Sequence, residues 1–155
     1  MLTNRPELQA QHLKQQFTLR GREPELRFAL LFIDLDRFKP VNDQYGHAAG
    51  DAVILQVCER LTAAVRDSDA ISRHGGDEFL LLLNDITDNE AATVFANKLV
   101  QVLAQPYQIE GRSVLLSASI GIAIYPDHCN SAKALISYAD AAMYRAKQQG
   151  GSRAC

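Results

Sequence analysis

The sequence has little of what disulfide frameworks, zinc sites or membrane anchors require. Its three cysteines, Cys58, Cys129 and Cys155, are odd in number and widely spaced, with no CxxC pair or Cys/His cluster. That pattern favours a reducing compartment such as the cytosol. The start lacks the apolar segment of a signal peptide, and the longest clean apolar run, Phe28–Ile33, is far too short to cross a bilayer. We therefore expect a cytoplasmic domain that makes no membrane contact itself, either free or on the cytoplasmic side of a membrane-tethered parent protein.

An excess of charge of one sign is also missing. Lys and Arg number 16 and Asp and Glu number 18, so the formal net charge is −2. This balance offers no field for wrapping a polyanion, and nucleic acid is therefore not an expected partner. A GxxxxGK[ST] motif is absent too, which excludes a P-loop.

Size and composition fit one domain. The chain has 155 residues, of which 47% are hydrophobic and 22% charged, as is typical of a globular fold with a real core. It stops abruptly at Arg153-Ala154-Cys155, where a new strand is expected to start. We therefore expect residues 1–155 to be a single domain, a fragment of a longer multidomain protein.

Hydrophobic periodicity predicts alternating strands and helices. Apolar runs predict a buried strand over Phe28–Leu35 and further strands over residues 70–73, 79–84, 107–109 and 112–125, with a turn at Glu110-Gly111. Helices are predicted over Glu7–Leu19 and Asp51–Val65, from a cap at Thr87 or Asp88 to about Leu103, and over Lys133–Gln149 after a cap at Asn130 or Ser131. A short helix or turn is predicted over Phe38–Tyr45, broken by Pro40 and Gly46. Strands joined by a hairpin and by helices on the same side indicate an α+β fold. Its central sheet is mixed or mostly antiparallel, with flanking helices.

The stretch Arg73–Phe79, which reads RHGGDEF, is predicted to be a tight hairpin. Gly75 and Gly76 lie between short apolar runs, and adjacent glycines readily take the positive φ angles of a two-residue turn. The acids Asp77 and Glu78 follow directly, so the hairpin would lift two carboxylates to the rim of the sheet. By itself this pattern is more typical of a solvated turn.

A second pair of acids ends the first buried strand. Asp34 and Asp36 are two residues apart and would face the same side of a strand. Together with Asp77 of the hairpin, Asp34 has the oxygen ligands that suit Mg²⁺ and leave room for phosphates. Lys39, just past the strand, is placed to meet a phosphate as a point charge. Solvated surface acids and a solvated lysine are the simpler alternative for each residue alone.

The segment from Asn42 to Asp51 has hydrogen-bonding edges that suit guanine. The Asn42 amide matches a carbonyl and a ring nitrogen, and the Asp51 carboxylate matches N1–H and an amino group. Taken alone, these residues are also ordinary turn and N-cap formers.

Four segments in order resemble the motifs of GGDEF domains, the diguanylate cyclases. They are FIDLDRFKPVNDQYGHAAGD (Phe32–Asp51), RHGGDEF (Arg73–Phe79), SASIGIAIYP (Ser117–Pro126) and ADAAMYRAKQQG (Ala139–Gly150). The resemblance implies a palm-like fold, ferredoxin-like and related to nucleotide cyclases. It also implies condensation of two GTP into cyclic di-GMP with release of pyrophosphate, at a site completed only in a homodimer of two such domains.

The resemblance also assigns roles to residues. Asp34, the carbonyl of Leu35, Asp77 and Glu78 would bind Mg²⁺ or Mn²⁺, with Asp77 accepting the proton of the attacking 3′-hydroxyl. Asn42 and Asp51 would read guanine beside His47 and Phe38. Lys39 and Lys147 would meet the triphosphate, while Gly75 and Gly76 form the turn. An arginine common at position 151 of the family is Gly151 here, so one triphosphate contact is not expected.

An inhibitory product site is implied as well. Arg66 and Asp69 form an RxxD motif five residues before the glycine pair, where GGDEF domains bind cyclic di-GMP. Lys98 stands near the place where many members carry a helping arginine. The alternative is that Arg66 lies at the C-terminal end of a helix, where its positive charge interacts favourably with the helix dipole. For the whole chain, the alternative to an enzyme is a GTP- or cyclic di-GMP-binding module that regulates a neighbouring domain without turnover.

Overall fold

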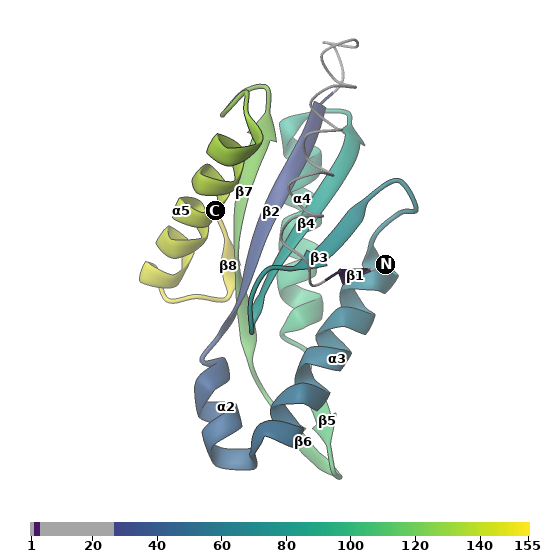
Figure 1. The fold of residues 1–155 in the computed structure, drawn as a ribbon, viewed down its shortest axis with the longest axis vertical. Helices are drawn as coiled ribbons and strands as arrows, with labels where there is room; N and C mark the ends of the chain where they lie inside the picture. The colour runs from purple at the N-terminus through teal and green to yellow at the C-terminus, as the bar shows by residue number, and fades with distance from the viewer. Residues whose placement is uncertain (1, 4–26) are drawn as a thin grey trace.

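The computed structural model describes residues 2–3 and 27–155, and the predicted helix over residues 7–19 lies outside them. A six-stranded sheet has the order β1-β3-β4-β2-β7-β8. The strands are β1 (Leu2–Thr3), β2 (Arg27–Asp36), β3 (Ala70–Arg73), β4 (Glu78–Ile86), β7 (Ser117–Tyr125) and β8 (Arg153–Ala154). The three inner pairings are antiparallel, and only the edge pairs β1–β3 and β7–β8 are parallel. The fold is therefore α+β with a mostly antiparallel sheet, as predicted (Figure 1).

Strand β2 is the centre of the molecule and is buried on both faces. Phe28, Leu30 and Phe32 pack on one side, in a cluster that includes residues of α5 (Ala132–Gln148). The alternate residues pack on the other side, against α3 (His47–Ala64) and α4 (Asn89–Leu103). Because side chains alternate along a strand, Asp34 and Asp36 continue the face that α5 covers.

The helices lie on both faces of the sheet, so the expectation that they share one side is wrong (Figure 1). The face of β7 that looks toward α5 has a glycine at its middle. A Cβ on Gly121 would lie 1.9 Å from the carbonyl oxygen of Ala139 and 2.4 Å from the backbone nitrogen of Met143. The backbone of α5 therefore rests directly on the sheet, and this contact fixes where the end of α5 lies.

Helix boundaries follow the predictions closely, with two differences. Pro40 does not break α2 (Phe38–Tyr45), because it stands in the first turn, where a missing N–H removes no helical bond. Helix α3 begins at His47, four residues before the predicted start. The other caps are as expected, with the Asp88 side chain accepting from the Ala91 N–H at 2.8 Å and the Ser131 hydroxyl accepting from the Ala134 N–H at 3.2 Å.

The last predicted β region is two separate pieces. Strands β5 (Tyr107–Ile109) and β6 (Arg112–Val114) form their own hairpin, which turns at Glu110-Gly111 as predicted. Arg60 of α3 anchors it by donating to the carbonyls of Val102, Gln105 and Pro106, with its guanidinium 3.9 Å from the Tyr107 ring centre. Among the described residues, no helix has the length and apolar character needed to cross a bilayer.

Candidate active site

The turn of the RHGGDEF stretch differs from the predicted one. Residues 74–77 separate the two strands, and neither Gly75 nor Gly76 has a positive φ, so the two-residue turn is wrong. Instead the N–H groups of His74 and Gly75 both donate to the Glu78 carbonyl, at 2.8 and 3.3 Å. A Cβ on Gly75 would lie 3.0 Å from a Glu78 carboxylate oxygen, which is a tight contact with the end of a side chain.

Arg73, which the sequence did not single out, holds this turn. Its Nε donates to the carbonyls of Gly75 and Gly76, at 3.1 Å each, and its Nη2 donates to the Gly76 carbonyl at 2.6 Å. A guanidinium offers several donors in a fixed plane, which suits two neighbouring carbonyls. The turn that carries Asp77 is thus fixed by Arg73, the last residue of β3.

The hairpin acids lie beside the acids that end β2. Asp34 is the register partner of Glu78, and the Leu35 N–H donates to the Asp77 carbonyl at 3.1 Å. Burial raises the pKa of Asp34 to about 7, with the negative charges of Asp77 and Glu78 adding to the effect and Lys147 opposing it. The charge of Asp77 therefore acts on Asp34.

Asp36, on the same face of β2, has a different environment. Its carboxylate accepts from the hydroxyls of Ser117 (2.6 Å) and Ser119 (2.7 Å), from the Ser152 N–H (2.8 Å) and from the Lys147 ammonium (3.0 Å). Burial works to raise the pKa of Asp36, but these four hydrogen bonds outweigh burial and hold the pKa below its usual value. The pKa values of Asp34 and Asp36 are thus shifted in opposite directions.

Lys147 of α5 reaches into this acid cluster. Its ammonium lies 3.0 Å from Asp36 Oδ1, 3.4 Å from the Leu35 carbonyl and 3.7 Å from Asp34 Oδ1. The other predicted triphosphate residue, Lys39, is exposed near the start of α2.

The predicted guanine residues surround the α2–α3 junction. Asn42 and Phe38 of α2 lie against Gly50 of α3, where a Cβ would approach to 1.6 Å from Asn42 Oδ1 and 3.3 Å from the Phe38 ring. His47 and Asp51 are exposed in the first turns of α3. Gly50 was not predicted, and only the close approach of two helices reveals its role.

The donors at the end of β2 fit a hard divalent cation. Asp34, Asp77 and Glu78 offer carboxylate oxygens and Leu35 offers a carbonyl. Burial is the main cause of the raised pKa of Asp34, and the negative charges of Asp77 and Glu78 add to it. Within residues 2–3 and 27–155, no three His, Cys, Asp or Glu side chains form a complete metal-binding group. Carboxylate oxygens are the donors that Mg²⁺ prefers, and proteins commonly hold this ion through one or two of them while substrate phosphates complete its shell.

Arg66 and Asp69 of the RxxD motif form an ion pair with each other. Arg66 donates to both oxygens of Asp69, through its backbone N–H and Nε to Oδ2 and through Nη2 to Oδ1, and it also donates to the Asn84 carbonyl. The side chain of Asp69 is 1% exposed and that of Arg66 is 58% exposed. Both residues line a pocket of about 350 Å³ with Ala91 and Phe95 of α4. Lys98 lines a neighbouring pocket that shares those two α4 residues.

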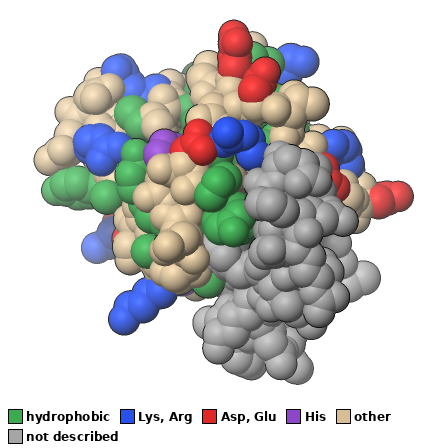
Figure 2. Space-filling view, turned by 90° about the horizontal axis from the view of Figure 1, so that it is seen from above, with side chains coloured by type: hydrophobic (Ala, Val, Ile, Leu, Met, Phe, Trp, Pro, Cys, Tyr) green, Lys and Arg blue, Asp and Glu red, His purple; other side chains and the backbone are tan. Residues whose placement is uncertain are grey.

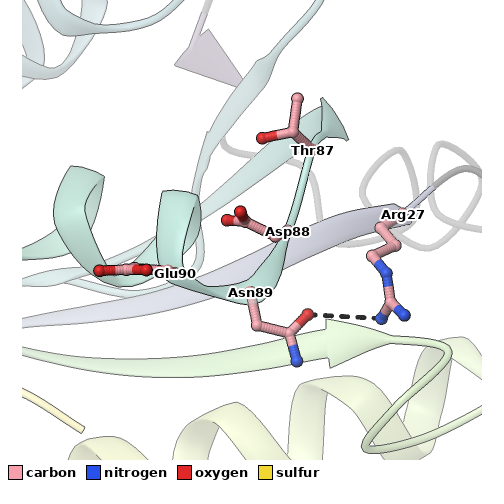
Figure 3. A pocket seen from close by; sticks show the side chains of 5 residues that line it. All are labelled: Arg27, Thr87, Asp88, Asn89 and Glu90. Carbon is pink, nitrogen blue, oxygen red and sulfur yellow. Dashed lines mark hydrogen bonds between the residues drawn. The ribbon is translucent and has the colours of Figure 1, made fainter.

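A further pocket lies at the opposite end of the sheet, at the start of β2 (Figure 3). Asn89 points toward Arg27, which also pairs with Asp127 at 2.5 Å, whereas Glu90 points away. Hydrogen bonds from Asn89 and Arg27 lower the pKa of Asp127. Figure 2 looks onto this end and shows acidic and basic side chains intermixed. These contacts tie β2, α4 and the segment after β7 together.

The architecture is the palm-like α+β fold of nucleotide cyclases, with acids at the ends of two adjacent strands. The family model described as "Diguanylate cyclase, GGDEF domain" matches residues 1–153. The chain belongs to this family.

Relatives and solved structures agree. The bifunctional diguanylate cyclase/cyclic di-GMP phosphodiesterase MucR of Pseudomonas aeruginosa is 53% identical over 129 residues, which are 83% of this chain and 19% of MucR. Diguanylate cyclase TpbB of the same species is 43% identical, over 82% of this chain and 30% of TpbB. The crystal structure of the TpbB GGDEF domain has a TM-score of 0.92 and 36% identity, covering 96% of this chain and 92% of that one. The chain thus spans less than a third of the length of these two curated relatives.

Proposed function

We propose that this chain is a diguanylate cyclase module that condenses two GTP molecules into cyclic di-GMP. In each of two steps, the 3′-oxygen of one GTP forms a bond to the α-phosphorus of the other. The bond from that phosphorus to the bridging oxygen breaks, pyrophosphate leaves, and the hydroxyl proton passes to Asp77. Because each domain holds one GTP, two copies must face each other for both steps.

The observation that carries this proposal is the electrostatic coupling of Asp34 with the hairpin acids. Burial and the charges of Asp77 and Glu78 raise the pKa of Asp34 to about 7. Adjacent carboxylates with too little positive charge form a site that a divalent cation completes. We assign Asp34, the Leu35 carbonyl, Asp77 and Glu78 to Mg²⁺ or Mn²⁺. When bound, the metal supplies positive charge beside the triphosphate.

The remaining roles follow the shape of the site. Lys147 and Lys39 are assigned to the triphosphate, because phosphoryl transfer depends on positioning and charge neutralisation. Asn42 and Asp51 are assigned to guanine, with Phe38 and His47 beside them. The packing of Asn42 and Phe38 over Gly50 supports this assignment, because it limits the orientations that the amide can take.

The RxxD motif is proposed to bind cyclic di-GMP as an inhibitor. Arg66 is exposed at the rim of a pocket whose wall contains apolar residues of α4, which suits a guanine base next to a guanidinium. Binding there would act on the docking of two domains, since the motif precedes the catalytic turn by a whole strand. Lys98 is assigned a supporting role.

The test of turnover is incubation with GTP and Mg²⁺ at rising protein concentration. Synthesis by a dimer is expected to rise faster than linearly with protein, since the active species needs two copies. Chromatography of cyclic di-GMP and pyrophosphate release measure the rate independently. If no product forms at any concentration, the chain is not a cyclase.

Asp77→Asn tests the assigned proton acceptor. We expect turnover to fall by about 10²–10⁴-fold, as for loss of a positioned base. The unfolding temperature should change little, because Asn keeps the shape of the side chain. Asp140→Asn on the exposed side of α5 is the charge-matched control and should keep activity. Full activity of Asp77→Asn would assign the base elsewhere.

Arg66→Ala tests the inhibitory site. Added cyclic di-GMP is expected to inhibit this variant at least tenfold less well, as for loss of a bidentate charged contact. Lys98→Ala, which leaves the Arg66–Asp69 pair intact, should give a smaller shift. Unchanged inhibition in Arg66→Ala would mean that the RxxD motif does not bind cyclic di-GMP and is only the end of a helix.

A regulatory module that binds nucleotide without turnover is the second candidate. The observation in its favour is Gly151, which stands where GGDEF domains commonly carry an arginine, so that one contact to the triphosphate is missing. This candidate predicts saturable GTP or cyclic di-GMP binding with no pyrophosphate released, so the turnover assay separates the two.

A further inference from the structure

Four donors converge on Asp36, a residue to which the proposed chemistry gives no role. They come from three separate parts of the chain: Ser117 and Ser119 of β7, Lys147 of α5, and the Ser152 N–H of the segment before β8. The side chain of Asp36 is 12% exposed and Ser119 is fully buried. A buried charge that is this well satisfied keeps one fixed orientation.

The Lys147 ammonium has three N–H donors. One is directed to Asp36 Oδ1 at 3.0 Å and a second to the Leu35 carbonyl at 3.4 Å, while Asp34 at 3.7 Å is an ion-pair partner beyond hydrogen-bond range. This leaves one donor for an outside acceptor. Since a lysine stem is long and flexible, a fixed anchor greatly reduces the orientations open to that donor.

We infer that Asp36 is a positioning residue that holds Lys147 for the GTP triphosphate. The inference rests on the proposed function and deepens it. Asp36 does not touch substrate; it presents the ammonium in advance, so that less freedom is lost when a phosphate oxygen binds.

Gly151 is the residue that lets this arrangement close. Its φ is +74°, and a Cβ there would lie 2.8 Å from Asp36 Oδ2 and 2.9 Å from its carboxyl carbon. The next N–H, that of Ser152, donates to the same Oδ2 at 2.8 Å. Any side chain at position 151 would therefore displace the carboxylate or the turn.

A double-mutant cycle on GTP affinity tests whether Asp36 acts through Lys147. Equilibrium dialysis is expected to show Asp36→Asn binding GTP about tenfold more weakly, equivalent to one charged hydrogen bond. In a Lys147→Met background, the same change should alter affinity less than about twofold. Equal losses in both backgrounds would overturn the inference, because a merely structural role does not depend on Lys147.

Chemical labelling tests the anchor without nucleotide. An amine-reactive ester should acylate Lys147 several-fold faster in Asp36→Asn than in the wild type, while exposed Lys39 reacts equally in both, as mass spectrometry would measure. Unchanged labelling of Lys147 overturns the inference. Faster labelling in a protein that neither binds nor converts GTP would uphold the anchor and reject the proposed function, so the two failures are distinguishable.

Glycine variants provide the matched control. Gly111 has φ +77° with nothing within 4 Å of its would-be Cβ, so Gly111→Ala adds backbone strain alone. Gly151→Ala adds the same strain and the contact with Asp36. We expect Gly151→Ala to reproduce the labelling and affinity changes of Asp36→Asn, and Gly111→Ala to show neither. Identical behaviour of the two alanine variants would overturn the role of Gly151.

Discussion

Replacing Asp34 by asparagine is expected to stabilise the metal-free fold while ending turnover. The folded state raises the pKa of Asp34 from 3.8 to about 7, so it favours the protonated carboxyl. The ionised carboxylate of Asp34 therefore destabilises the folded state. Asparagine has nearly the same shape and carries no charge, so it removes that destabilisation.

The pH dependence has a definite sign. Below about pH 3.8 the carboxyl is protonated in both the folded and unfolded states, and the penalty is absent. Between that pH and about 7 the unfolded chain ionises first, so wild-type stability falls as pH rises. Above about 7 both states are ionised, and the penalty stays at its full value.

The magnitude follows from the shift of about three pKa units, which corresponds to an upper bound of about 4 kcal/mol. The side chain is 17% exposed and Lys147 lies 3.7 Å away, so solvent and relaxation reduce this value. We expect Asp34→Asn to raise the free energy of unfolding by about 1–2 kcal/mol at pH 8 and by clearly less at pH 5.

Urea unfolding at both pH values, with a chelator present, is the assay. Asp36→Asn is the matched control on the same face of the same strand. Its pKa is lowered, so its ionised form stabilises the fold above the unfolded pKa, and that contribution is lost as pH falls. Asp36→Asn should therefore destabilise at pH 8, by about 2 kcal/mol. A raised pKa for Asp34 would be contradicted if Asp34→Asn is not more stable than the wild type at pH 8, or if the gain is equal at both pH values.

Two further predictions concern how the frame is held. Gly121→Ala would place a Cβ 1.9 Å from the Ala139 carbonyl oxygen, so α5 must move off the sheet. We expect the free energy of unfolding, measured by thermal unfolding, to fall by about 3 kcal/mol or more, as in severe overpacking. A wild-type melting temperature would contradict the close contact. Arg60→Met removes three hydrogen bonds to carbonyls and the contact with the Tyr107 ring; we expect a loss of about 2–3 kcal/mol in urea unfolding. Arg112→Met, whose guanidinium lies 5.9 Å from the ring centre of another tyrosine, should cost less than about 1 kcal/mol, and equal losses would contradict the anchoring role of Arg60.

The sequence by itself determined the elements and the neighbourhood of the acids. Strand β2, the caps of α4 and α5, and the turn at Glu110-Gly111 follow from local patterns, because periodicity, capping and turn chemistry depend on residues a few positions apart. The proximity of Asp34 to the hairpin acids could also be predicted, because acids occur in the sequence at the ends of both predicted strands.

Tertiary structure alone decided what each acid experiences. Asp34 and Asp36 have the same side chain on the same strand face, yet one pKa is raised and the other lowered. Burial and the charges of the hairpin acids raise the pKa of Asp34. Hydrogen bonds from distant residues, among them Ser117 and Ser152, which lie 81 and 116 positions further along the chain, lower that of Asp36. Likewise Gly50 is a glycine because Asn42 and Phe38 approach it closely, not because its backbone needs a positive φ. Solvation, ion pairing and close approach are set by groups brought together only by folding, and no local pattern encodes them.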